Sequence, residues 1–203
     1  MLGLCCFGFL FVSVFRLFAR NSVALKILMS AIFFTFVQVG ACFGFGLLGL
    51  RLIGCASDID SNERTLYAFA LGIGITGWVL FLIGVAGVLN NFAIGVFLFC
   101  GVLALVLCRS DISFQVIRPE GFIGVTILGL LLSVFILDFF ESFAPPADAD
   151  TLAYHFALPK LFLNAGKIEF IPRALDGAIP LLLQMTYLPP LALGGELGLT
   201  LWV

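Results

Sequence analysis

Charged side chains are scarce in this chain of 203 residues, in which Lys, Arg, Asp and Glu together make up 11%. Hydrophobic side chains make up 62%, and the mean hydropathy is +1.21. Such a chain lacks the polar surface that a water-soluble fold requires, so an integral membrane protein is predicted. The pI near 5.2 and the lack of a basic patch exclude nucleic acid as a partner, because phosphate backbones bind clustered Lys and Arg.

Motifs for thiolate metal sites and for soluble nucleotides are also missing. The six cysteines contain no Cys-x-x-Cys pair, which argues against a zinc site or a redox pair. No phosphate-binding Gly-x-x-x-x-Gly-Lys-Ser loop occurs, and no Gly-x-Gly-x-x-Gly stands in the strand-to-helix context that dinucleotide binding needs. We interpret the cysteines as small buried side chains.

Long uncharged runs predict the membrane-spanning helices. No charged residue falls within 27–50 or within 65–108, and a third apolar run covers 121–137. One crossing needs roughly 20 apolar residues, so the run at 65–108 is too long for a single helix. Asn90-Asn91 interrupts that run where a tight hairpin between two helices is expected. The predicted helices lie near 27–50, 66–88, 92–108 and 121–140, and together they form the transmembrane part of region 1–142.

Both ends of the chain are apolar. Residues 2–19 predict a short or tilted membrane helix rather than a signal peptide, because their basic residues follow the apolar stretch instead of preceding it. Residues 178–203 contain Pro180 and Pro189-Pro190, which disfavour a straight span. This last run stops without a charged anchor, so we expect a truncated N-terminal fragment, with a naturally short protein as the alternative.

The predicted fold class is therefore all-α, a polytopic transmembrane helical bundle. Glycines recur along its helices, beginning with Gly40 and Gly44 in Gly-x-x-x-Gly spacing. They permit close helix approach, which we interpret as packing within the chain rather than as a dimerisation face. The oligomeric state stays open.

The balance of Lys and Arg gives only a provisional orientation. One membrane face receives Arg51, Arg64, Arg109 and Arg118, whereas the other receives Arg16, Arg20, Lys26, Lys160, Lys167 and Arg173. We place the first set in the cytoplasm of a bacterial cell, which puts the long loop at 143–177 outside the cytoplasmic (inner) membrane. Asp60 and its charged neighbours before the second helix are interpreted as a solvated turn and a helix cap.

Polar residues concentrate in the outer loop, between Pro145 and Lys160. Pro145-Pro146 ends the preceding helix, and Asp150 is placed to cap a short helix that starts at Thr151. Asn164-Ala165-Gly166 predicts the stop of a second short helix. We expect these amphipathic helices to lie in the membrane interface, with one apolar face in the headgroup region: Leu152, Phe156, Leu158, Leu161, Phe162 and Leu163.

The pattern Pro-Pro-x-Asp-x-Asp-x-Leu-x-Tyr-His-x-x-x-Pro-Lys, followed by Ala-Gly-Lys-Ile, Met-Thr-Tyr and Ala-Leu-Gly-Gly-Glu, resembles bacterial GT-C glycosyltransferases. These enzymes are relatives of the protein O-mannosyltransferases and lipid A aminoarabinose transferases. The resemblance spans mainly residues 143–199. It implies a polyprenyl-phosphate-linked sugar donor, inversion at the anomeric carbon, and an essential acid that matches Asp150, with Asp148 as the second acid. Family members carry more helices than this chain.

Sugar transfer from a lipid phosphate needs a base for the acceptor hydroxyl, and Asp150 is the candidate. Asp148 either assists it or joins it in holding a divalent cation, Mg²⁺ or Mn²⁺. The candidate substrate-binding residues are Tyr154, His155, Lys160, Lys167 and Arg173, the cations being suited to phosphate. Structural roles stay open beside these: a helix cap for Asp150, a backbone hydrogen bond for His155, and interfacial anchoring for the cations.

The sequence thus favours a membrane glycosyltransferase, or its N-terminal part, that moves a sugar from a polyprenyl-phosphate donor to an acceptor at the outer face of the membrane. We expect the fragment alone to be inactive. The alternative is a non-catalytic multi-pass scaffold or transport subunit, in which the loop acids only cap helices. Asp150→Asn separates the two, because only the enzyme loses an activity.

Overall fold

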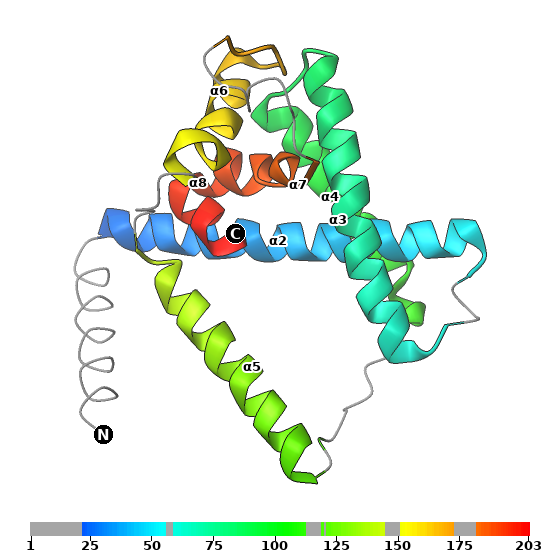
Figure 1. Cartoon of the computed structure of the whole chain (residues 1–203). Coiled ribbons are helices and arrows are strands. Elements are labelled where there is room, and N and C mark those ends of the chain that lie inside the picture. The colour runs from blue at the N-terminus through cyan, green and yellow to red at the C-terminus, as the bar shows by residue number, and fades with distance from the viewer. Residues whose placement is uncertain (1–21, 56–58, 113–118, 120, 145–150, 173–181) are drawn as a thin grey trace, which may run out of the picture.

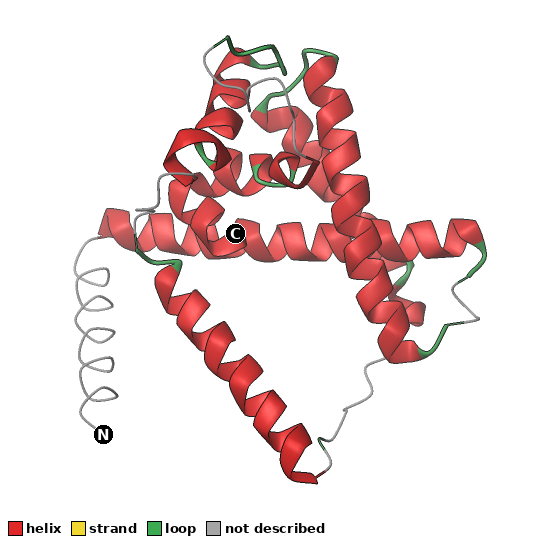
Figure 2. Ribbon diagram, in the orientation of Figure 1, coloured by secondary structure: helices red, strands yellow, loops and turns green. Residues whose placement is uncertain are grey.

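The computed structural model describes residues 22–55, 59–112, 119, 121–144, 151–172 and 182–203. Within these ranges the chain is helical and contains no strand, which confirms the predicted all-α bundle (Figures 1 and 2). The elements are α2 (Ser22–Ile53), α3 (Ser61–Val85), α4 (Asn91–Leu107), η1 (Arg109–Asp111), α5 (Gly121–Glu141), η2 (Thr151–His155), α6 (Ala157–Ala165), α7 (Leu182–Met185) and α8 (Leu188–Trp202). The segment predicted as a helix at 2–19 lies outside the described residues.

Three of the described helices, α2, α3 and α5, are long and apolar enough to cross a bilayer. α4 is apolar but shorter. A spanning helix satisfies all of its backbone hydrogen bonds internally, which is the condition for lying in hydrocarbon. The chain is accordingly a membrane protein.

Polar caps set the start of α3 and α4. The Asp60 carboxylate accepts a hydrogen bond from the Asn62 backbone N–H at 3.3 Å, so the predicted cap is present. The Asn90 side chain accepts from the Ala93 N–H at 2.9 Å and begins α4, inside the apolar run that Asn90-Asn91 was expected to interrupt. Gly87 has a φ of 73° in the connecting turn, a conformation that favours glycine. This short turn joins α3 and α4 into a helical hairpin, in which each helix packs mainly against α2 rather than against the other.

α2 is the central element and packs against α3, α4 and α8 (Figure 1). Glycines make these contacts close. A Cβ atom on Gly72 of α3 would lie 1.7 Å from the Cys42 carbonyl oxygen of α2, and one on Gly44 of α2 would lie 1.9 Å from the Gly101 carbonyl oxygen of α4. In a bilayer the hydrophobic effect does not drive helices together, because lipid tails are as apolar as the side chains. Close backbone contact of this kind stabilises helix association there instead. Gly44 and Gly72 therefore pack within the chain, as interpreted from the sequence.

The C-terminal segment is not a straight span. Pro189 and Pro190 lie in the first turn of α8, where a missing backbone N–H costs no helical hydrogen bond. The break within α8 falls instead at Gly195, whose φ of 70° is non-helical. The prolines therefore start a helix, and a glycine kinks it.

The helix α6 ends as predicted, with Gly166 in the left-handed conformation at a φ of 67°. Its apolar face does not lie as predicted. Phe156, Leu158 and Phe162 are buried among side chains of the bundle, so their placement in the headgroup region is wrong. Leu163 packs at the edge of the same core, whereas Leu152 and Leu161 are exposed. An amphipathic pattern indicates that one face of a helix is covered, but it does not indicate whether protein or lipid covers that face.

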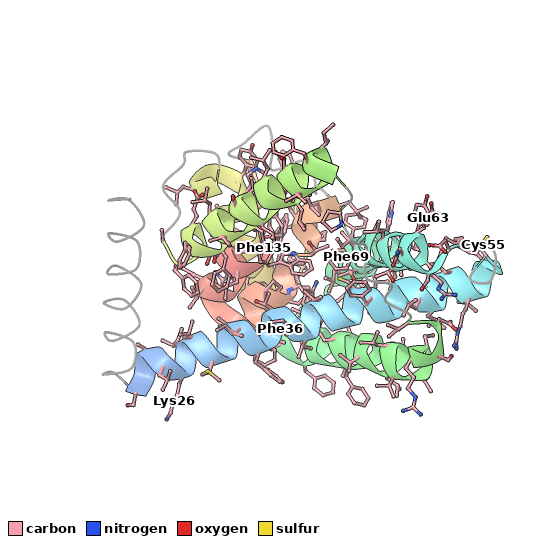
Figure 3. The ribbon with its side chains drawn as sticks, turned by 90° about the horizontal axis from the view of Figure 1, so that it is seen from below. Lys26, Phe36, Cys55, Glu63, Phe69 and Phe135 are labelled. Carbon is pink, nitrogen blue, oxygen red and sulfur yellow. The ribbon has the colours of Figure 1, made fainter. Side chains whose placement is uncertain are left out.

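The charged turns at the other end of the hairpin gather together. The Arg51 guanidinium at the end of α2 forms an ion pair with Asp111 and donates to Ser110 Oγ at 2.8 Å. This hydrogen bonding holds the pKa of Asp111 below its ordinary value. Cys55 and Glu63 mark this end of the molecule, and Lys26 marks the other (Figure 3). We call the end that carries Cys55 and Glu63 the arginine end, after Arg51, Arg64 and Arg109.

Candidate functional site

Two backbone hydrogen bonds fix the segment after α6 to the α3–α4 hairpin. Leu89 N–H donates to the Gly166 carbonyl at 3.0 Å, and Ile168 N–H donates to the Gly84 carbonyl at 2.9 Å. A Cβ atom on Gly84 would lie 2.6 Å from the Ile168 side chain, so the two segments touch. α6 is thereby seated at the turn of the hairpin, away from the arginine end. We call this region the α6 end.

Only part of the predicted site falls within the described residues. The two candidate acids, Asp148 and Asp150, and the candidate phosphate ligand Arg173 lie outside them, and so does the predicted magnesium or manganese site. The described chain resumes at η2, a single π-helical turn, and continues into α6. Tyr154, His155, Lys160 and Lys167 can therefore be placed.

The histidine is held by an amide from a distant helix. His155 is half-buried, and its Nδ1 lies 2.9 Å from Nε2 of Gln184 on α7. Gln184 is only 2% exposed, so its amide has little access to water. The Tyr154 ring lies against the imidazole, with a centroid separation of 4.2 Å. The predicted backbone carbonyl partner for His155 is thus replaced by a side chain 29 residues away.

Lys160 lines a pocket where α4, α6 and α8 meet. Its Nζ lies 2.5 Å from Oε1 of Glu196 on α8, and both side chains are largely accessible. The pocket has a volume of about 360 Å³. Its lining combines three polar side chains with three apolar ones: Asn91, Lys160 and Asn164, and Leu163, Leu191 and Ala192.

Lys167 lies at a different place from Lys160. Its Nζ pairs with Glu169 at 2.8 Å. Glu169 lines a second pocket of about 400 Å³, together with residues of α6 and with Phe170 and Pro172. Neither pocket is lined by both lysines. Each lysine also has an acidic partner, so any phosphate must displace a carboxylate to reach the ammonium group.

Two residues of this region were given no role at the level of sequence: Gln184, and Glu196, which ends the quoted Ala-Leu-Gly-Gly-Glu motif. Gln184 directly precedes the Met-Thr-Tyr tripeptide, and Glu196 is the only charged residue in 177–203. A lone polar group in an apolar segment was the available signal, since such a group needs a partner. Local spacing could not identify the partner of either residue, because that partner lies too far away along the chain.

The described residues contain no cluster of three His, Cys, Asp or Glu side chains suited to a metal ion. In comparisons with known proteins, no family model, curated protein or solved structure matches the chain. The likeness to GT-C glycosyltransferases therefore rests on the motif residues themselves.

Proposed function

We propose that the chain is all or the N-terminal part of a multi-pass GT-C type glycosyltransferase in a bacterial cytoplasmic membrane. It transfers a sugar from a polyprenyl-phosphate donor to an acceptor at the outer face. The observation that carries the proposal is the continuation of the Asp-x-Leu-x-Tyr-His motif into η2 and α6, which the hairpin holds beside a pocket containing Lys160.

In the proposed reaction Asp150 takes the proton from the acceptor hydroxyl. The resulting oxygen forms a bond to the anomeric carbon, and the bond between that carbon and the phosphate oxygen breaks. The electron pair leaves with the polyprenyl phosphate, and the configuration at the anomeric carbon inverts. Lys160 pairs with the departing phosphate through a charge-assisted hydrogen bond.

The pocket at the α6 end suits a molecule with a charged head and an apolar tail. Lys160 and the amides of Asn91 and Asn164 offer donors, while the leucines beside them offer an apolar wall. Asn91 is the first residue of α4, so the positive end of that helix dipole points toward the pocket. The Lys160–Glu196 pair is accessible, and exposed pairs contribute only about 0–1 kcal/mol, so a phosphate exchanges with the carboxylate at small cost.

The proposed orientation puts the arginine end in the cytoplasm. Short loops rich in Arg favour that side. Arg51 lies in the last turn of α2 and Arg109 directly follows α4, so each stands at one such loop. α3 then runs outward and α4 runs inward, which brings their hairpin and α6 to the outer surface. A lipid-linked donor reaches this level of the bilayer with its phosphate in the headgroup layer.

The test is sugar transfer by the protein expressed from its genomic reading frame. Asp150→Asn is expected to lower the transfer rate by at least about 100-fold, the typical contribution of a positioned base. Glu63→Gln is the matched control, since it removes an exposed carboxylate at the arginine end (Figure 3). Membrane insertion and yield should match the wild type for both variants.

Retention of wild-type transfer by Asp150→Asn removes this residue from the mechanism. If the wild type transfers no sugar from any polyprenyl-phosphate donor, the scaffold or transport alternative is favoured. The pairing of both Lys160 and Lys167 with acids is the observation that speaks for that alternative, since paired lysines serve as structural contacts.

A further inference from the structure

We infer that Gln184 is a positioning residue that fixes the tautomer of His155 and presents its Nε2–H to an oxygen of the donor phosphate. The role toward the donor deepens the proposed function and rests on it. The tautomer itself rests only on the contact between the two side chains.

The contact defines which ring nitrogen carries the proton. The amide nitrogen of glutamine donates hydrogen bonds and accepts none. Its 2.9 Å approach to His155 Nδ1 therefore makes Nδ1 the acceptor. In a neutral imidazole only one nitrogen is protonated, so the proton resides on Nε2.

Burial makes this contact costly to lose. Gln184 is 2% exposed, and its neighbours Met185 and Thr186 are fully buried. Without its histidine partner, the Gln184 amide would therefore lack a hydrogen bond from water as well. α7 is itself held against α3, where a Cβ on Gly77 would meet the Leu182 carbonyl oxygen at 2.5 Å. The amide is thus supplied by a short helix that packs against α3.

The other ring nitrogen, Nε2, is the one that remains for a ligand. His155 is half-buried, and its Nε2 has no hydrogen-bond partner among the described residues. The Tyr154 ring at 4.2 Å restricts rotation of the imidazole. A ring held at Nδ1 and packed on one face has its Nε2–H aimed in one direction, which is the condition for a specific donor.

The single histidine of the chain makes the test direct. Protein labelled with ¹⁵N-histidine gives the signals of one ring only, measured at about pH 9, where histidine is ordinarily neutral. We expect limiting shifts for an Nε2–H tautomer, with the Nδ1 signal displaced as in a hydrogen-bond acceptor. Gln184→Met should give averaged shifts of two exchanging tautomers.

Gln38→Met is the matched control, because it removes the other fully buried glutamine amide, which hydrogen-bonds no histidine. It should leave the histidine signals unchanged. A protonated Nδ1 in the wild type, or unchanged signals in Gln184→Met, overturns the inference. The wild-type spectrum alone decides the tautomer if Gln184→Met does not fold.

A second measurement tests the role toward the donor. Adding polyprenyl monophosphate to the wild type should shift the Nε2–H signal, and Gln184→Met should lower sugar transfer about tenfold, the worth of one good hydrogen bond. A fixed tautomer with no response to polyprenyl monophosphate overturns the assignment of the phosphate as ligand. Absence of transfer in the wild type removes the proposed function and leaves the tautomer result standing.

Discussion

The helices α2 and α5 are both apolar enough to cross a membrane, yet they differ completely in their packing. The most apolar stretch of α5 has a mean hydropathy of 2.4 and none of it is buried, whereas 39% of the corresponding stretch of α2, with a mean of 2.0, is buried. α5 extends away from the other elements in Figure 1. Hydropathy thus identifies which segments suit lipid, and it does not identify which of them meet one another.

Both helices contain glycine, but only those of α2 make close contacts with other helices. Gly44 and Gly46 of α2 lie directly against the backbones of α4 and α3. Gly129 of α5 has nothing within 4 Å of the position that a Cβ would take. Where lipid and side chains are equally apolar, shape complementarity decides which helices associate.

The largest predicted effect concerns the packing of α2 against α3. Gly72→Ala puts a Cβ within 1.7 Å of the Cys42 carbonyl oxygen, so α2 and α3 must separate. We expect a loss of about 2–3 kcal/mol in the free energy of unfolding, measured in detergent micelles, because an overpacked contact outweighs the better helix propensity of Ala. Gly129→Ala, with the same gain in propensity and open space, should be neutral or slightly stabilising. Equal effects in the two variants contradict the packing argument.

A smaller effect on the free energy of unfolding is expected when either of two buried glutamines, Gln184 or Gln38, is replaced. Gln184 has a histidine partner, whereas the Oε1 of Gln38 is buried without a hydrogen-bond partner among the described residues. Gln184→Met should lower the free energy of unfolding by about 1 kcal/mol, and Gln38→Met should leave it unchanged or raise it. Thermal unfolding of the two variants side by side measures this. The reverse order contradicts the assignment of partners.

The smallest effect is expected at the arginine end. Arg51 lowers the pKa of Asp111 from its ordinary value of 3.8, so the pair adds stability above that pH and loses it as the pH falls through the lowered value. Because both side chains are partly exposed, solvent screening keeps this gain small. Asp111→Asn should remove this part of the acid dependence of unfolding and have little effect near neutral pH. Added salt should weaken it in the wild type.

The overall fold could be predicted from sequence because its signals are local. Uncharged runs predicted the apolar helices, Asn90 caps α4, and Gly166 stops α6. What sequence could not supply was the covering of each apolar face. Phe156 and Phe162 meet the bundle instead of the headgroups, and this depends on the two backbone bonds that seat α6 on the hairpin.

The candidate site was predictable only in part for the same reason. The motif drew attention to His155 and Lys160, but their partners Gln184 and Glu196 come from α7 and α8 and are set by tertiary packing. Sequence spacing carries no information on contacts 29 or 36 residues apart. The roles of Asp148 and Asp150 stay predictions.

The proposed function requires that the α6 end, and not α5 or the arginine end, binds the lipid-linked phosphate. The most direct measurement is photo-crosslinking of the membrane-embedded protein with a photoreactive polyprenyl phosphate, mapped by mass spectrometry. We expect labelling of α6 and α8 beside Lys160, and loss of that labelling when unlabelled polyprenyl phosphate competes. Labelling confined to α5 and the turns around Arg51 and Arg109 contradicts it.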